Sequence, residues 1–278
     1  MKVLVLGGSG YLGRALLTHI DELDCAIDVV VRSEAGARKV KTASARAGVF
    51  DTLDVTGRAY DHIINLVADC GRGDILLSDV VRANLIYPLA LVETLAFGAV
   101  LNVSTALPEL YSNYSLSKRM LERSLVRVAA RKDARVLNVQ VHNMYGPGSD
   151  ETNLVTSLIS RMRGSKPIML SSCTNSRDFV YIDDVVGALS ALCFRIDRIA
   201  QLSTVQVGSG LPVRLRALVE KLQAKIGTSS EIVYGARRDN IHEMPVLAAD
   251  LTAIAATGWK PAWSLDAGLD ATIRSLKT

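Results

Sequence analysis

The sequence lacks long apolar runs: nowhere do its 278 residues contain the roughly 20 uninterrupted apolar residues that a membrane-spanning helix needs. The run from Met1 to Gly7 leads directly into glycines, without the pattern of a signal-peptide cleavage site. Apolar residues make up 49% and charged residues 22% of the chain, a balance typical of globular proteins. We therefore expect a cytoplasmic protein with no membrane partner, formed by one large domain or two unequal ones.

Cysteine and histidine are few and scattered. They show neither a Cys-x-x-Cys motif nor the spacing of a metal site. The residues are Cys25, Cys70, Cys173, Cys193, His19, His62, His142 and His242. We expect buried, reduced thiols rather than disulfides, and no metal. The net charge of +4 comes from basic residues spread along the chain, so the sequence favours a mildly basic surface over a nucleic-acid partner.

The first two-thirds of the chain alternates short apolar runs with longer helical patterns. The runs expected to form strands are residues 2–6, 26–31, 62–67, 99–103 and 135–141. Helical periodicity is clearest over residues 74–96 and 113–131. Most of the short runs are apolar on both faces, as in buried parallel strands. The alternation predicts an α/β fold, a Rossmann-type doubly wound parallel sheet with helices on both sides.

The pattern becomes more irregular after residue 145, where Gly146-Pro147-Gly148 interrupts it. No internal repeat or low-complexity segment is present. We expect residues 1–145 to form the cofactor-binding domain and residues 146–278 to form mainly a smaller substrate-binding lobe that is interleaved with the sheet. This lobe would pack against the carboxyl edge of the sheet, where open α/β sheets bind ligands.

Three glycines follow the first expected strand: Gly7, Gly10 and Gly13. They stand between that strand and a helix, in the pattern of a tight turn that brings the backbone close to a pyrophosphate and lays phosphate on the helix N-terminus. A glycine pattern alone is weak evidence, but the strand–turn–helix context favours a dinucleotide site.

Arg32 and Ser33 end the second expected strand, at the place where an acidic residue would accept a hydrogen bond from the ribose 2′-hydroxyl of NAD. Asp28 lies earlier, inside the strand, and is not expected to reach the ribose. Arg32 can pair with a 2′-phosphate, and Ser33 can donate a hydrogen bond to it. We therefore expect NADP(H) to be favoured over NAD(H).

Tyr114 and Lys118 are four residues apart on an expected helix, so their side chains share a face. A phenol has an ordinary pKa of about 10, and a neighbouring ammonium favours the phenolate and allows proton exchange near neutral pH. Ser104 and Thr105 directly follow the expected strand at 99–103. With the glycine turn upstream, the pair is better explained as a proton-transfer site than as chance surface residues.

In their order and spacing, these motifs resemble those of the extended short-chain dehydrogenase/reductase family, which contains NAD-dependent sugar-nucleotide epimerases and dehydratases. The resemblance covers nearly the whole chain. The other matching segments are residues 65–68, Asn84, and residues 143–147, 177–185, 258–261 and 264–265.

The resemblance implies a role for each matching residue. Thr105 would hydrogen-bond the substrate oxygen, and Ser104 could share this role. Tyr114 would be the acid/base, and Lys118 would lower the pKa of the tyrosine and hold the nicotinamide ribose. The implied cofactor contacts are Gly7, Gly10, Tyr11, Leu12, Gly13, Arg32, Ser33, Asp51, Leu66, Ala68 and Lys118.

Three further residues match positions that contact a nucleotide-sugar substrate in this family. Asn143 and Arg177 are two of them, and an arginine suits a diphosphate because its guanidinium binds through paired hydrogen bonds. Arg238 falls where the family often places another phosphate-binding arginine, although a solvated basic loop explains it equally well.

Two departures from the family pattern narrow the reaction. Only eight residues separate Thr105 from Tyr114, fewer than is usual, so the lip of the substrate pocket is expected to be short. The dehydratases of the family carry an Asp-Glu pair after the threonine, where this chain has Ala106-Leu107. Without these carboxyl groups, elimination of water from a hexose has no evident acid and base.

Three interpretations remain open. The first is an NADPH-dependent reductase of the 4-keto group of a nucleotide-linked 4-keto-6-deoxyhexose, and the second is an NAD-dependent 4-epimerase. The third is a non-catalytic relative that senses nucleotide. Arg32 favours the first, because a net reductase gains from a reduced NADP pool. Apolar residues in 74–96 also indicate a possible homodimer; they are Ile75, Leu76, Val80, Leu85, Leu89 and Val92.

Overall fold

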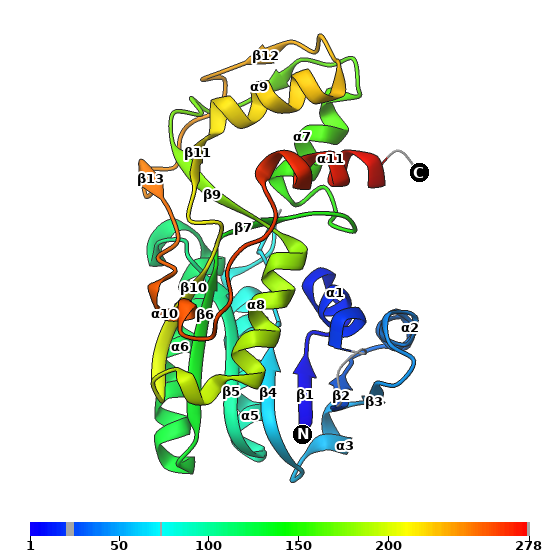
Figure 1. Ribbon diagram of the computed structural model, residues 1–278, viewed down its shortest axis with the longest axis vertical. Helices are drawn as coiled ribbons and strands as arrows, with labels where there is room; N and C mark the ends of the chain where they lie inside the picture. Colours follow the sequence, from blue (N-terminus) through cyan, green and yellow to red (C-terminus); the bar gives the residue numbers. More distant parts are fainter. Residues whose placement is uncertain (21–24, 73, 277–278) are drawn as a thin grey trace.

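The computed structural model describes residues 1–20, 25–72 and 74–276. Seven strands in these ranges form one sheet in the order β10–β6–β5–β4–β1–β2–β3, with all neighbours parallel (Figure 1). The strands are β1 (Lys2–Leu6), β2 (Ala26–Val30), β3 (Gly48–Phe50), β4 (Ala59–Asn65), β5 (Ala96–Thr105), β6 (Arg135–Val141) and β10 (Leu202–Val207). Strand order reverses between β1 and β4, a switch point at which such sheets bind ligands. The predicted Rossmann-type fold is confirmed.

Helices cover both faces of this sheet. Ile64 belongs to an apolar cluster that includes residues of α1 and α8, whereas its neighbour Ile63 belongs to a second cluster with α5 and α6. Successive strand residues point to opposite faces, so the strands must be apolar on both sides. The helices that pack around the main sheet are α1 (Tyr11–Ile20), α2 (Glu34–Ala43), α3 (Thr52–Val55), α5 (Tyr87–Thr94), α6 (Asn113–Lys132) and α8 (Ile182–Phe194).

The single helix expected over residues 74–96 is not continuous. The chain forms α4 (Leu77–Val81), a π-helical turn η1 (Arg82–Ile86) and then α5. Pro88 explains the interruption, because its ring crowds the carbonyl of Asn84 one turn earlier and it has no N–H to donate. The widened turn relieves this, and the Tyr87 N–H bonds to the Arg82 carbonyl, five residues back.

The later part of the chain builds a second lobe above the carboxyl edge of the sheet (Figure 1). Strand β9 (Ser176–Tyr181) is its centre and pairs with three short strands. These are β7 (Asn143–Tyr145), β11 (Pro212–Arg214) and β13 (Val246–Leu247), and a separate pair joins β8 (Ile168–Met169) to β12 (Ile232–Val233). The main helices of this lobe are α7 (Leu154–Met162), α9 (Leu215–Ile226) and α11 (Leu265–Ser275). The short helical segments contact elements of the main sheet and its helices: η2 (Glu109–Tyr111) contacts α6, η3 (Ile196–Arg198) contacts α8, and α10 (Thr252–Ala255) contacts β10.

The two parts of the chain are interleaved. Helix α8 and strand β10 follow residue 146 in sequence, yet α8 packs with α1, and β10 pairs with β6 at the edge of the main sheet. Asp178 of β9 is fully buried, and its carboxylate accepts hydrogen bonds from the backbone N–H groups of Ser209, Gly210 and Ala249. A buried carboxylate needs such donors. Asp178 therefore ties the second lobe to the end of β10.

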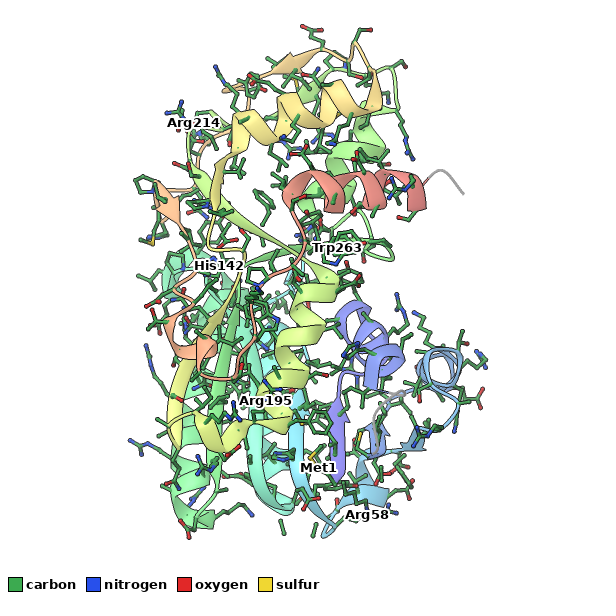
Figure 2. The ribbon with its side chains drawn as sticks, in the orientation of Figure 1. Met1, Arg58, His142, Arg195, Arg214 and Trp263 are labelled. Atoms are coloured by element: carbon green, nitrogen blue, oxygen red, sulfur yellow. The ribbon has the colours of Figure 1, made fainter. Side chains whose placement is uncertain are left out.

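The two edges of the main sheet have different surroundings. Figure 2 shows Met1 and Arg58 at the amino-terminal edge and His142 at the opposite edge, facing the second lobe. No helix in the described ranges has the length and apolarity that crossing a membrane requires. The edge near His142, between the sheet and the second lobe, is where a ligand site is expected.

Candidate active site

The glycine turn between β1 and α1 packs directly against the end of β4. Gly7 has a φ of +80°, and a Cβ there would lie 2.9 Å from the Leu66 carbonyl carbon. A Cβ at Gly13 would lie 2.5 Å from the Gly7 carbonyl oxygen. Both positions therefore require glycine. The turn leads into α1 at Tyr11, and the first N–H groups of a helix are a ready site for phosphate.

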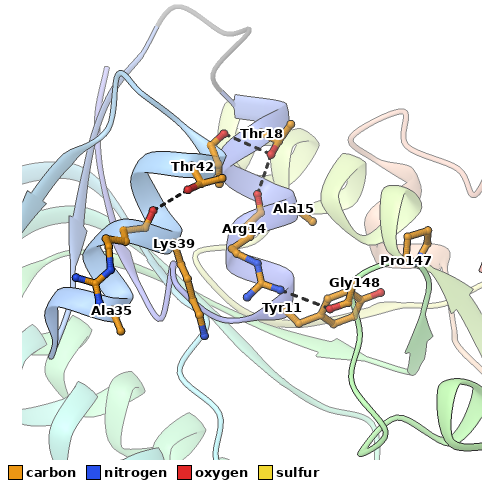
Figure 3. A pocket seen from close by; sticks show the side chains of 11 residues that line it. Tyr11, Arg14, Ala15, Thr18, Ala35, Lys39, Thr42, Pro147 and Gly148 are labelled. Carbon is orange, nitrogen blue, oxygen red and sulfur yellow. Dashed lines mark hydrogen bonds between the residues drawn. The ribbon is translucent and has the colours of Figure 1, made fainter. Parts of the chain in front are cut away.

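A groove of about 680 Å³ lies beside this turn, between α1 and α2 (Figure 3). Three of its lining residues are basic: Arg14, Arg38 and Lys39. The Arg14 guanidinium donates to the Ser9 carbonyl at 3.1 Å and to the Gly148 carbonyl at 3.4 Å, so it joins α1 to the loop after β7. Figure 3 shows this contact at one side of the groove. The groove adjoins the glycine turn and carries positive charge.

The end of β2 carries the residues that the sequence indicated. Arg32 is exposed, and its guanidinium lies 5.9 Å from the centre of the Tyr87 ring. Ser33 is the N-cap of α2, where its hydroxyl accepts a hydrogen bond from Gly36 N–H at 3.1 Å. Asp28 is buried and accepts a hydrogen bond from the Tyr60 hydroxyl at 2.9 Å. Asp28 is thus occupied inside the strand layer, as expected.

Asp51, the third expected cofactor residue in this region, has a local structural role. It is the N-cap of α3, and its carboxylate accepts hydrogen bonds from the N–H groups of Leu53 and Asp54. Such capping stabilises a short helix by roughly 1 kcal/mol. A cofactor contact at Asp51 stays a prediction.

Thr105, Tyr114 and Lys118 meet at the carboxyl edge of the sheet. Thr105 is the last residue of β5, and Tyr114 and Lys118 lie in the first turns of α6. The phenol of Tyr114 is hydrogen-bonded to the Thr105 side chain. The start of α6 is fixed by a capping box between Ser112 and Ser115, which sets where the tyrosine stands.

The Lys118 ammonium is held by a backbone carbonyl. Its side chain is almost fully buried, and Nζ donates to the Val67 oxygen at 2.9 Å. Burial lowers the pKa of Lys118 to about 8, although the nearby Glu122 carboxylate opposes the shift. Burial also raises the pKa of Tyr114, and the Thr105 hydrogen bond partly offsets this. The Lys118 ammonium therefore contacts the Val67 carbonyl, and its side chain projects from the same face of α6 as the Tyr114 phenol.

The segment after β4 is held in place by Asn84, a residue of the π-helical turn. The Asn84 side chain accepts a hydrogen bond from Asp69 N–H at 2.7 Å and donates to the Asp69 carbonyl at 2.8 Å. It also donates to the Ser117 hydroxyl at 3.0 Å. Asn84 therefore locks the loop that follows Leu66 and Ala68 to the helix that carries Lys118.

Two of the expected substrate residues lie close to this edge of the sheet. Ser104 is buried next to Thr105, but strand alternation places its side chain on the opposite face of the sheet. Its hydroxyl has no hydrogen-bond partner among the described residues. Asn143 begins β7, and its amide donates to the Asp178 carbonyl at 3.2 Å.

The two expected phosphate-binding arginines differ in their surroundings. Arg177 is buried in β9 and forms an ion pair with Glu243 at 2.5 Å. Arg238 is exposed and lines a cavity of about 230 Å³ whose walls include Leu154 and Leu170. Arg238 is therefore available to a ligand, whereas the charge of Arg177 is already balanced by the protein.

Three residues near the candidate site were not predicted as site residues from the sequence. Cys70 is exposed, which corrects the expectation that every thiol is buried, and its thiol lies near both Tyr114 and Lys118. Glu122 follows Lys118 by four residues, a spacing that could have revealed it. Glu243 lies 66 residues from Arg177 in sequence, so no local pattern pointed to it.

Comparisons with known proteins agree with this geometry. The family model described as "NAD dependent epimerase/dehydratase family" matches residues 3–208. CDP-abequose synthase from Salmonella typhimurium is 24% identical over 294 aligned residues, which cover 99% of this chain and 98% of the relative. dTDP-L-rhamnose 4-epimerase from Burkholderia thailandensis is 36% identical over 148 residues, covering 51% of this chain and 39% of that protein.

Solved structures share the fold. The UDP-glucuronic acid 4-epimerase from Bacillus cereus, in complex with UDP-glucuronic acid and NAD, superimposes with a TM-score of 0.83 at 18% identity. The match covers 100% of this chain and 99% of the other. The resemblance inferred from the motifs is therefore confirmed by the family match over most of the chain. This chain belongs to the NAD dependent epimerase/dehydratase family.

Proposed function

We propose that the protein reduces the 4-keto group of a nucleotide-linked 4-keto-6-deoxyhexose with NADPH. The observation that carries the proposal is the meeting of Thr105, Tyr114 and Lys118 at the same edge of the sheet as the glycine turn. The similarity to CDP-abequose synthase along nearly the whole of both chains supports a role in the modification of nucleotide-linked sugars.

The residues present fit a dinucleotide. A Cβ would fill the cradle at Gly7 and Gly13, and the turn opens onto the N-terminus of α1, so its backbone can approach a pyrophosphate closely. We propose that Arg32 and Ser33 hold the 2′-phosphate of NADP. The exposed Arg32 guanidinium and the burial of Asp28 leave positive charge at this point of the site. When bound, the reduced nicotinamide supplies the hydride that the C4 carbon receives.

The proton comes from this chain. In the proposed mechanism Tyr114 donates its phenolic proton to O4 as the C4–O4 double bond becomes a single bond, and Thr105 donates a hydrogen bond to the developing alkoxide. Lys118 holds the nicotinamide ribose and compensates the phenolate that remains. The balance is one hydride to C4 and one proton to O4, and solvent then reprotonates Tyr114.

On the substrate side we propose that Asn143, Arg177 and Arg238 bind the nucleotide diphosphate. The exposed Arg238 beside a cavity supports this. For Arg177 the proposal requires that the phosphate replace the Glu243 carboxylate as its partner. The absence of an acidic pair at Ala106-Leu107 argues against a dehydratase.

A second candidate is a nucleotide-sugar 4-epimerase that retains NAD. It is favoured by the 36% identity to a dTDP-L-rhamnose 4-epimerase over half of this chain. An epimerase regenerates its own cofactor and gains little from NADP, so Arg32 at the end of β2 favours the reductase. A non-catalytic nucleotide sensor would not need Thr105, Tyr114 and Lys118 together.

We also propose a homodimer formed through α4, η1 and α6. Of the residues named from the sequence, Ile75 and Leu76 are exposed, whereas Val80, Leu85 and Val92 lie in the core and cannot contribute. The exposed set includes Leu77, Ile86 and Met120 as well. We propose that these exposed apolar side chains pack against a second copy of the chain. Light scattering at micromolar concentration tests this, and a monomer mass excludes it.

A substrate panel tests the proposed reaction. CDP-, dTDP-, UDP- and GDP-linked 4-keto-6-deoxyhexoses are each mixed with enzyme and NADPH, and the loss of nicotinamide absorbance is followed. We expect steady oxidation with at least one of them. Interconversion of sugars without net oxidation would support the epimerase, and nucleotide binding without any reaction would support the sensor.

A further inference from the structure

Three asparagines form a continuous hydrogen-bonded row inside the main sheet. The Asn65 amide donates to the Asn102 side-chain oxygen at 2.9 Å, and the Asn102 amide donates to the Asn138 side-chain oxygen at 3.0 Å. All three side chains are buried, with 1%, 0% and 5% of their surface exposed. We call this row the asparagine ladder.

The ladder follows the register of the sheet. Asn65 of β4 is the partner of Asn102 in β5, and Asn102 is the partner of Asn138 in β6. Strand alternation places the three residues on the same face as Ile63, which packs with α5 and α6. The row therefore crosses three central strands beneath the helix that carries Lys118.

The ladder ends on Val67, the residue whose carbonyl holds Lys118. The side-chain oxygen of Asn65 accepts a hydrogen bond from Val67 N–H at 3.2 Å, and the carbonyl of the same residue accepts from Lys118 Nζ at 2.9 Å. The Val67 N–H is also one of the atoms nearest to a Cβ at Gly7. Both polar groups of Val67 are thus engaged, one by the ladder and one by the lysine.

The row has a single direction. Asn65 and Asn102 each accept a hydrogen bond on one side and donate on the other, so turning either of these two amides over breaks the bonds on both of its sides. Apolar side chains would fill this part of the sheet without the cost of burying three amides. A fully connected polar row inside a core instead favours one arrangement over its alternatives. Here the arrangement that it favours is that of the Val67 backbone, whose N–H the ladder binds.

We propose that Asn65, Asn102 and Asn138 are positioning residues, which fix the backbone of Val67 through its N–H so that the carbonyl of the same residue holds the Lys118 ammonium in place. Asn102 and Asn138 act through Asn65 and touch neither substrate nor cofactor. The inference depends on the proposed function only for the catalytic importance of Lys118. The physical coupling between the ladder and Lys118 stands apart from it.

A double-mutant cycle measures this coupling without substrate or cofactor. Asn102→Leu and Lys118→Met are made singly and together in the full-length chain, and urea unfolding is measured at pH 7. We expect the effect of Lys118→Met on the unfolding equilibrium constant to differ by about fivefold or more between the two backgrounds. The control cycle pairs Lys118→Met with Val100→Ala, a buried change two residues earlier on the same strand. It should be additive within about twofold.

Additivity in the Asn102 cycle as well would overturn the proposal. Should Asn102→Leu fail to fold, Asn138→Leu takes its place, since Asn138 is the outer end of the row and accepts from Asn102 alone among the ladder residues. The interpretation of the double-mutant cycle does not depend on whether the protein is a reductase, because the cycle measures unfolding alone.

A pH profile gives a second readout, which a purely structural role would not move. The Val67 carbonyl stabilises the ammonium form of Lys118, so a loosened peptide lowers the pKa of the lysine further. Where a substrate has been identified, Asn102→Leu should shift the alkaline limb of kcat/KM for the cofactor, which reports the free enzyme and is expected near pH 8, to lower pH by about half a unit. Val100→Ala should leave the limb in place. A limb that does not move in Asn102→Leu contradicts the proposal.

Discussion

The Arg177 guanidinium lies 2.5 Å from the Glu243 carboxylate, and only 6% and 12% of the two side chains are exposed. Arg177 also donates to the carbonyl groups of Ser176 and Met244. A phosphate that binds here must compete with a carboxylate already in place. Glu243 therefore weakens the binding of an anionic ligand at Arg177, and its removal gives a direct test of the proposed substrate site.

We expect Glu243→Gln to lower the KM for the nucleotide-sugar by about 3–10-fold, because the amide keeps the shape of the side chain and removes the competing negative charge. Steady-state kinetics measure this. Glu231→Gln, an exposed carboxylate of the same lobe, is the control and should leave KM unchanged. If KM rises in Glu243→Gln, the Arg177–Glu243 ion pair only stabilises the fold of the second lobe and does not compete with the substrate.

Arg32→Asp should reverse the cofactor preference. An aspartate repels a 2′-phosphate and accepts from a 2′-hydroxyl, so the ratio of kcat/KM for NADPH to that for NADH should fall by about 100-fold. The matched control is Arg198→Asp, the same charge change at an exposed residue of η3. If the unaltered protein already uses NADH equally well at subsaturating cofactor, the assignment of Arg32 is wrong.

Tyr114→Phe should remove the proton donor and keep the packing of the ring. We expect cofactor affinity to survive while turnover falls by about 10²–10⁴-fold, the usual loss for a general acid. Tyr111→Phe is the matched control and should turn over almost normally, because Tyr111 has Ser115 four residues on in place of a lysine. Near-normal turnover in the Tyr114 variant would rule out the proposed mechanism.

Lys118→Met should stabilise the fold at neutral pH while it destroys activity. The pKa of Lys118 falls from 10.5 to about 8 on folding, so between these values the unfolded chain binds the extra proton and the stability of the native protein rises with pH. The advantage of the variant in the free energy of unfolding should therefore shrink, by an amount on the order of 2 kcal/mol, between pH 7 and pH 10.5. Urea unfolding across this range tests it. If the difference in the free energy of unfolding between the variant and the unaltered protein does not depend on pH, the lowered pKa of a buried Lys118 is contradicted.

The sequence predicted those parts of the fold whose signal is local. The apolar runs located the five strands expected in the first half of the chain, and the glycine turn and the Tyr114–Lys118 spacing indicated the candidate site. Strand β3, of three residues, is too short to show a periodicity. The break at η1 depends on how Pro88 meets the carbonyl of Asn84, which a helical pattern conceals.

Contacts between distant residues could not be predicted in this way. Glu243 meets Arg177 only because β13 pairs with β9, and the asparagine ladder depends on the register of three strands. In the sequence, Asn65 and Asn138 are each a polar residue in an apolar strand. Their common role becomes visible only when the sheet aligns them with Asn102.

The origin of the hydrogen at C4 tests the central claim most directly. NADPH carrying deuterium at the transferable position, prepared separately for each face of the nicotinamide, is incubated with enzyme and the active 4-keto-6-deoxyhexose nucleotide. The mass of the sugar product is then measured by mass spectrometry. The account predicts one deuterium in the product from one of the two cofactors, with one NADP⁺ formed for each sugar reduced. Sugar products that interconvert at C4 without deuterium and without cofactor consumption would contradict it.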